Sequence, residues 1–213
     1  MKYTELQQYF KNQKIFSTKD LETAFWHRYK NNLLNRLKKW YINKITKGRY
    51  CFDKKDLTQI DVYNIANKIY EPSYISLEYA LNVYNIVPEW VFTITSITTK
   101  KTHTFKSEIH NFSYRNIKKN YFFWYNIESS KNHNNHYKIA TLEKAIIDYI
   151  YLNPHIKTKE DFYELRWNID ELKKQINIKK FNKILSQYKQ KTFLNRIKIF
   201  ILYINSNDRH YQY

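Results

Sequence analysis

The sequence predicts an α+β fold in which a small basic module precedes a larger mixed domain. Two patterns support this prediction. Residues 1–53 contain three helical periodicities followed by a short hairpin, and residues 61–213 contain alternating apolar stretches with helical segments before and after them. The 213 residues are long enough for a small module and a medium-sized core, and an aromatic content of 18% supplies large apolar side chains to bury.

The elements of the N-terminal module follow from short local patterns. A first helix is predicted over residues 4–12, and a second begins at Ser17, because Ser17 and Asp20 have the spacing of a capping box. A third helix is predicted over residues 28–41. Two β-prone stretches then flank the only glycine of the chain, Gly48, which indicates a hairpin with Gly48 in its turn.

The third helix of this module carries a distinctive polar face. Opposite its apolar stripe, every side chain is a hydrogen-bond donor and none is acidic. Asparagine can read adenine with two hydrogen bonds, whereas a face that only confers solubility more often uses Glu and Lys. Three helices and a basic hairpin are the elements of a winged helix-turn-helix, whose third helix enters the major groove of DNA. The alternative is a small helical subdomain with a solvated basic face.

The predicted DNA contacts are of two kinds. Donors of the third helix are expected to meet base edges, while cations of the helix and the hairpin, or wing, meet phosphates. The predicted base-reading residues are Arg28, Asn32, Asn35 and Arg36, with Asn31 beside them, and the predicted phosphate-binding residues are Lys39, Lys44, Lys47 and Arg49.

The formal charge of +18 is concentrated at the two ends of the chain. Residues 1–52 hold 12 Lys and Arg against 3 Asp and Glu, residues 53–170 hold 15 against 14, and residues 171–213 hold 10 against 2. A localised excess of cations suits a phosphate-facing surface, and it also serves solubility. The sequence leaves two roles open for the basic tail at 171–213, which are binding a partner protein and binding nucleic acid.

The larger domain, residues 61–213, is predicted to combine helices with an antiparallel sheet of about four strands. Asp61, Ser76 and Thr141 are interpreted as helix N-caps, and two amphipathic helices are predicted in the tail. The aromatic run at 121–125 favours a strand buried on both faces over a surface that stacks on bases. The four strands are predicted over residues 90–97, 102–109, 111–117 and 121–127.

The composition argues against an enzyme. With one glycine, the chain has no P-loop or Rossmann turn, since both need several residues that let the backbone approach phosphate. The single cysteine, Cys51, excludes a disulfide framework and a cysteine-rich zinc site. Glu143 and Asp148 are five positions apart on a predicted helix and therefore point to different faces, so they form no acid–base pair. His133 and His136 have no carboxylate or cysteine at metal-ligand spacing. No catalytic residue, metal or cofactor is predicted.

The chain shows no targeting or membrane segment. The first residues contain no apolar stretch of the kind that marks a secretory signal. The longest apolar run, residues 199–204, is far too short to span a bilayer. A cytoplasmic protein without membrane contact is therefore predicted.

The middle of the chain resembles a known family. The residues that carry the resemblance are PSYISLEYAL at 72–81, Tyr84, IVPE at 86–89, Thr95, FSY at 112–114 with Ile117, and TLEKA at 141–145 with Asp148. Preceded by a wing that ends in KGRY, they resemble the AbiEi-type antitoxins of type IV toxin–antitoxin (abortive infection) systems. Tyr79 and Asn85 depart from the family pattern, which more often has a small residue and a glycine at these places.

The resemblance implies a two-domain regulator of its own promoter. In that family the winged helix binds inverted repeats in double-stranded DNA, and the C-terminal domain counteracts a nucleotidyltransferase toxin, with direct contact between the two proteins left open. The sequence also leaves open whether the repeats are filled by a dimer or by two monomers. A second hypothesis is a protein-interaction module that grips the toxin while the winged helix is vestigial. A third, a nuclease, lacks the carboxylate constellation that it would need.

Overall fold

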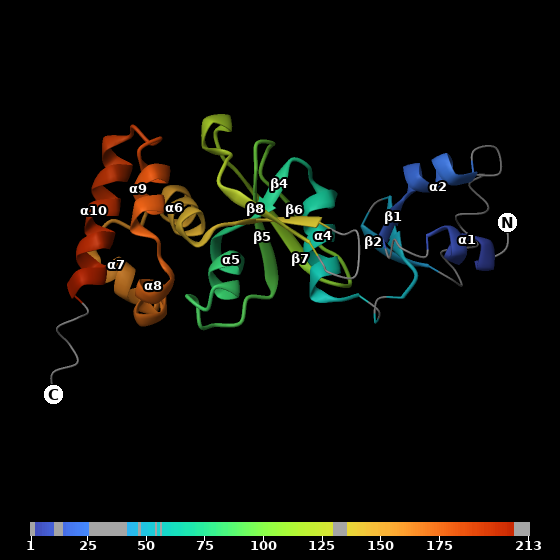
Figure 1. Cartoon of the computed structure of the whole chain (residues 1–213), viewed down its shortest axis with the longest axis horizontal. Helices are drawn as coiled ribbons and strands as arrows, with labels where there is room; N and C mark the ends of the chain where they lie inside the picture. The colour runs from blue at the N-terminus through green and yellow to red at the C-terminus, as the bar shows by residue number, and fades with distance from the viewer. Residues whose placement is uncertain are drawn as a thin grey trace.

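The computed structural model describes residues 3–10, 15–25, 42–46, 48–53, 55, 57–129 and 136–206. Its elements are arranged in a row (Figure 1): a small N-terminal sheet with its helices lies at one end, a large sheet lies in the middle, and the C-terminal helices lie at the other end. The predicted α+β class is confirmed.

The described part of the N-terminal module contains a helix, a strand, a second helix and a hairpin in chain order. Its three strands form an antiparallel sheet in the order β1-β3-β2, so the first strand pairs with the second strand of the hairpin. The third predicted helix, residues 28–41, lies outside the described residues. The elements are α1 (Tyr3–Tyr9), β1 (Ile15–Ser17), α2 (Thr18–Phe25), β2 (Asn43–Thr46) and β3 (Arg49–Cys51).

Two local predictions in this module are confirmed. The backbone N–H of Ser17 donates to Asp20 Oδ2 at 2.6 Å, and the N–H of Asp20 donates to Ser17 Oγ at 3.2 Å, which is the capping box predicted at the start of α2. Gly48 lies between β2 and β3 with a φ of 76°, a left-handed conformation that residues with a Cβ rarely adopt.

The central sheet differs from the predicted antiparallel meander of four strands. It has six strands in the order β6-β7-β5-β4-β9-β8, with β5 parallel to β7 and β4 parallel to β9. After β5 the chain turns back and forms β6 at the edge of the sheet. It then turns again and forms β7, which lies between β6 and β5. Because the direction of the chain has reversed twice, β7 runs parallel to β5. The strands are β4 (Ser73–Ile75), β5 (Thr93–Thr98), β6 (His103–Phe105), β7 (Asn111–Asn116), β8 (Tyr125–Ser129) and β9 (His136–Ala140).

The aromatic run at 121–125 is not the doubly buried strand that was predicted. Residues Lys119–Tyr121 form a 3-10 turn (η2), Trp124 has a φ of 60°, and β8 begins only at Tyr125. These side chains nevertheless pack against the main core, as the preference for burial over base stacking predicts.

Helices cover the sheet and form the C-terminal end. Thr58, rather than Asp61, is the N-cap of α4; Asp61 is its third helical residue, and its carboxylate accepts from the Thr58 N–H at 2.8 Å. Thr141 caps α6 as predicted, whereas Ser76 takes the N-cap position of α5 without a side-chain cap bond. The helices are α4 (Gln59–Ile69), α5 (Leu77–Val83), α6 (Leu142–Leu152), α7 (Lys159–Glu164), α8 (Ile169–Gln175), α9 (Ile178–Leu185) and α10 (Lys191–Ser206).

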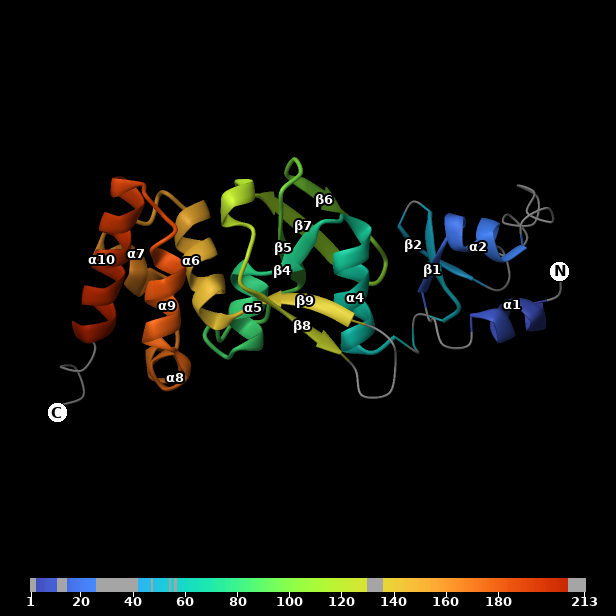
Figure 2. The same ribbon diagram turned by 45° about the horizontal axis from the view of Figure 1, so that its top comes forward.

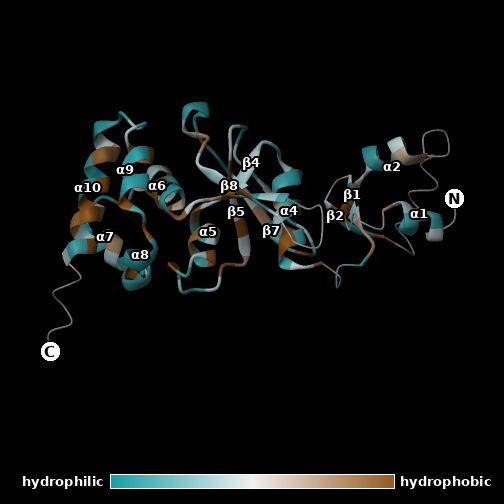
Figure 3. Cartoon of the chain, viewed as in Figure 1, coloured by the Kyte–Doolittle hydropathy of each residue, from teal (hydrophilic) through white to brown (hydrophobic). Residues whose placement is uncertain are grey.

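Up to residue 206, where the description of the tail ends, the basic tail contains three helices, α8, α9 and α10, where two were predicted. Its amphipathic character is confirmed: Phe181 and Ile184 on α9, and Ile197 on α10, are buried, while the lysines of these helices stay at least partly exposed. In Figure 3, hydrophobic and hydrophilic bands alternate along α10.

One buried ion pair lies where the sheet meets the C-terminal helices. The side chains of Lys144 and Asp148, one turn apart on α6, have no exposed surface, and Lys144 Nζ donates to Asp148 Oδ1. The hydroxyls of Tyr74 and Ser76 each donate to Asp148 Oδ2 at 2.9 Å, and Lys144 Nζ lies 3.3 Å from Tyr188 Oη. Burial raises the pKa of Asp148 and lowers that of Lys144, and the attraction between the two charges opposes both shifts.

Removing one member of this pair should destabilise the protein strongly. Asp148→Ala leaves the Lys144 ammonium buried without its counter-charge, and we expect it to lower the free energy of unfolding by about 3–5 kcal/mol in urea titrations. The double replacement Lys144→Met with Asp148→Leu should recover most of that loss, because it leaves no unpaired charge. Lys174→Ala, which removes an exposed partner of Glu171 at 3.9 Å, serves as control and should change the value by less than about 1 kcal/mol. Equal losses for Asp148→Ala and the control would contradict this description.

Candidate nucleic-acid interface

Two of the nine predicted DNA contacts lie on described strands. These are Lys44 on β2 and Arg49 on β3, on the two arms of the hairpin that was predicted to act as a wing. The other seven lie outside the described residues: Arg28, Asn31, Asn32, Asn35, Arg36, Lys39 and Lys47.

Lys44 is exposed and lines a hollow of about 350 Å³ between β2 and residues 104–108, which include the end of β6. The lining of this hollow contains a second exposed cation, Lys106. The hollow also includes one carboxylate, that of Glu108. The prediction from sequence did not place Lys106 near the hairpin, because nothing in the sequence indicates that β6 lies next to β2.

Arg49 is partly buried, and its side chain reaches the neighbouring helix. Its Nη2 donates to the backbone carbonyl of Lys68, in the last turn of α4. A cation at this end of a helix is favoured, since the last carbonyls have no helical partner and the helix dipole is negative there. Burial raises the pKa of the Tyr114 hydroxyl, and the positive charge of Arg49 offsets part of that rise. Arg49 therefore holds the hairpin against α4.

The small sheet packs on both of its faces. Phe16 and Tyr50, a cross-strand pair, face α1 and α2 and belong to a small core of their own. Alternate residues point to the opposite face, and there Ile15, Cys51 and Ile45 join the main core of the protein. Figures 1 and 2 agree that α4 lies between the central sheet and this small sheet. The contact through buried side chains fixes the direction in which the hairpin faces.

The buried cluster around Lys144 was not predicted from the sequence, where Asp148 was weighed as a catalytic residue only together with Glu143. The two carboxylates do point apart: Glu143 Oε1 accepts from the Asn177 N–H at 3.0 Å, and its Oε2 lies 3.4 Å from Lys180 Nζ. The spacing of four between Lys144 and Asp148 was the available signal, because residues four apart share a helix face. Since Lys144 and Asp148 are closed to solvent, their chemistry is that of a structural pair.

Among the residues that the structure describes, no three His, Cys, Asp or Glu side chains gather in a metal-binding arrangement. Over the same residues, no helix has the length and apolar character needed to cross a bilayer. No protein-family model matches the chain, and no curated protein matches it significantly.

The two described contacts should differ in their effect on stability. Arg49→Ala removes a charge-assisted hydrogen bond to the end of α4, and we expect it to lower the free energy of unfolding by about 1–3 kcal/mol. Lys44→Ala, at an exposed position, should change it by less than about 0.5 kcal/mol. Urea unfolding followed by tryptophan fluorescence measures both, and the assignment of Arg49 as an anchor fails if the two variants unfold at the same urea concentration.

Proposed function

We propose that the N-terminal module is a winged helix-turn-helix that binds duplex DNA, and that the chain regulates its own promoter as an antitoxin of the AbiEi type. The observation that carries the proposal is the order of the small sheet, β1-β3-β2. A strand placed between the first two helices and paired with the hairpin is what a winged helix-turn-helix requires. The hairpin also exposes a lysine, Lys44.

Electrostatics support duplex DNA as the ligand of this module. Residues 1–52 carry 12 basic against 3 acidic side chains, a net charge of +9, whereas the following 118 residues at 53–170 are close to neutral with 15 against 14. Phosphates are the polyanion that such a localised excess attracts, and the affinity is expected to fall steeply with salt. A second exposed lysine, Lys106 of the larger domain, lines the same hollow as Lys44, together with the carboxylate of Glu108.

The resemblance to the AbiEi-type antitoxins supports the regulatory role. The two most specific segments of that resemblance are SYISLEYAL, which supplies Tyr74 and Ser76, and LEKA with the following aspartate, which supplies Lys144 and Asp148. These four residues meet in one hydrogen-bonded cluster. The resemblance therefore rests on residues that hold the larger domain together, and it implies a shared domain whose partner in that family is a nucleotidyltransferase toxin.

Two substitutions distinguish reading of bases from attraction to phosphate. Asn35→Ala, on the proposed recognition helix, should weaken binding to DNA from upstream of the protein's own gene by about 1–3 kcal/mol and relax the preference at one base pair. Lys47→Ala, on the wing, should weaken all duplexes alike and reduce the slope of log K against log[salt] by about one. Fluorescence anisotropy with a panel of single-base-pair variants measures both effects. If the two variants lost affinity in the same way on every duplex, the groove assignment would be wrong.

A further inference from the structure

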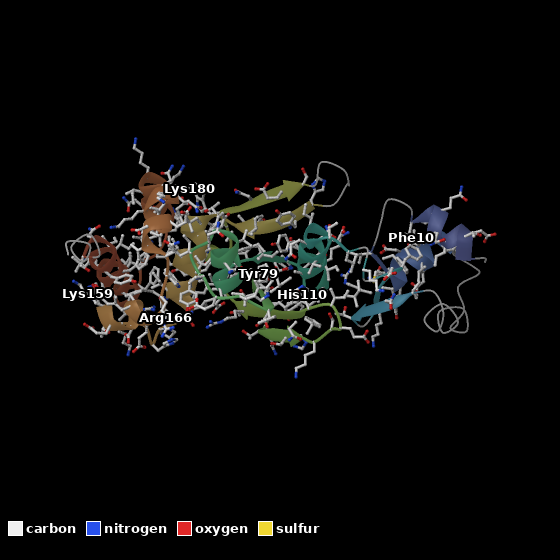
Figure 4. All side chains as sticks on the ribbon, turned by 90° about the horizontal axis from the view of Figure 1, so that it is seen from below. Phe10, Tyr79, His110, Lys159, Arg166 and Lys180 are labelled. Atoms are coloured by element: carbon white, nitrogen blue, oxygen red, sulfur yellow. The ribbon has the colours of Figure 1, made fainter. Side chains whose placement is uncertain are left out.

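The C-terminal helices enclose a groove at the end of the molecule opposite to the N-terminal module. It lies between α8, α9 and α10 and has a volume of about 500 Å³. Figure 4 shows Lys180 of α9 at this end and Phe10 of the N-terminal module at the other. Seven of the ten residues that line the groove are apolar, and the ten are Leu172, Lys173, Ile176, Ile178, Phe181, Asn182, Phe200, Ile201, Ile204 and Asn205.

The rim of this groove exposes aliphatic side chains to solvent. Ile178 is 59% exposed, Ile201 is 40% exposed, and the neighbouring Leu202 is 56% exposed. The floor is formed by Phe181 and Phe200, which are buried. Contiguous exposed apolar surface that surrounds a hollow is typical of a binding site, since leaving it in water is unfavourable.

The helices around the groove carry mainly positive charge. Residues 169–206, which span α8, α9 and α10, contain nine Lys and Arg against two carboxylates, Asp170 and Glu171. The Glu171 carboxylate is engaged by its own helix: it accepts from Gln175 Nε2 at 2.6 Å and lies 3.9 Å from Lys174 Nζ. Among the residues that line the groove there is one cation, Lys173, and no acidic side chain. An occupant that complements this surface combines apolar side chains with carboxylates.

The shape and the charge of the groove favour one kind of ligand over the others. A second copy of the chain would bring two segments with nine cations and two carboxylates against each other, which opposes association. A membrane surface suits a protruding apolar face, whereas this one is concave. The aromatic rings are buried in the floor and present no face on which a base could stack. A helix with an apolar ridge and acidic flanks fits a groove between helices, because its anchors recur at i, i+4 and i+7.

We propose that the groove between α8, α9 and α10 binds an acidic amphipathic helix of a partner protein. The apolar ridge of that helix fills the groove over Phe181 and Phe200, and its carboxylates face the surrounding lysines. This proposal goes beyond DNA binding and does not depend on it, because the groove and the hairpin are built from different elements at opposite ends of the molecule.

Binding of designed peptides to the full chain tests the proposal. The probe is an 18-residue fluorescent peptide with leucines at helical spacing and glutamates on both flanks, and anisotropy gives its dissociation constant. Two further peptides have the same leucines scattered around the helix, or lysines in place of the glutamates. We expect the patterned acidic peptide to bind at least about tenfold more tightly than either of the other two. Equal binding of the patterned and scattered peptides would overturn the proposal, because charge alone would then explain it.

A matched pair of variants locates the binding. Ile178→Asp places a carboxylate at the groove rim, and Ile127→Asp makes the same change at a similarly exposed position, 64%, on β8. Ile178→Asp should weaken the patterned peptide at least about tenfold, and Ile127→Asp should leave its affinity unchanged. Circular dichroism confirms that both variants fold. Equal affinities in the two variants would overturn the proposal.

Three other occupants of the groove would each give a different result with the same protein and its variants. If sedimentation showed a wild-type dimer that Ile178→Asp dissociates, the groove would belong to a second copy. If vesicles with anionic lipids were bound by the wild type and released by Ile178→Asp, it would belong to a membrane surface. If deleting residues 207–213 raised the peptide affinity tenfold, it would belong to the chain's own end. Each of these results would overturn the assignment to a partner helix.

Discussion

The larger domain depends on the buried contact between Lys144 and Asp148. Its partners come from separate parts of the chain: Tyr74 and Ser76 from the central sheet and the start of α5, and Tyr188 from the segment between α9 and α10. Apolar side chains can repack in several ways, but a buried charge that loses a partner is destabilised by several kcal/mol. Arrangements of β4, α6 and the C-terminal helices that separate the two charges are therefore disfavoured. The pair also joins two segments that are distant in the sequence, residues 73–81 and 141–148, at one hydrogen-bonded contact.

The N-terminal module is joined to that domain by packing as well as by the chain. One face of its small sheet supports α1 and α2, and the other face adds Ile15, Ile45 and Cys51 to the main core. Arg49 completes the attachment by binding the last turn of α4. The consequence for function is that the hairpin is presented in one direction, with Lys44 and Lys106 on neighbouring elements. A DNA duplex that lies along the hairpin would then meet cations from both parts of the protein, whereas the apolar groove at the far end stays available for a different ligand.

Local signals in the sequence predicted local structure well. The capping box at Ser17, the glycine turn at Gly48 and the N-cap Thr141 all depend on residues within four positions of each other, and all three are present. The order of strands in the sheet could not be predicted in the same way. Alternation of apolar and polar residues indicates that a segment is a strand, but it does not indicate which strand pairs with it. β4 has three residues, too few for any period to be visible, and β7 becomes parallel to β5 only because β6 occupies the edge. Of the residues predicted to bind DNA, Lys44 lies exposed on the hairpin. The interaction of Arg49 with α4 could not be predicted, because it joins residues 19 positions apart and no sequence motif indicates such a contact.

We propose above all that the N-terminal module recognises a particular DNA sequence. A titration of the purified protein against about 150 base pairs from upstream of its own gene, beside a scrambled duplex of the same length and at physiological salt, tests it directly. Specific regulators bind their sites about 10³–10⁷ times more tightly than other DNA, so we expect the upstream duplex to be retained at least about a hundredfold more tightly than the scrambled one. Equal, weak and salt-sensitive binding to both duplexes would contradict the claim, because it would reduce the charge of +18 to a general affinity for polyanions.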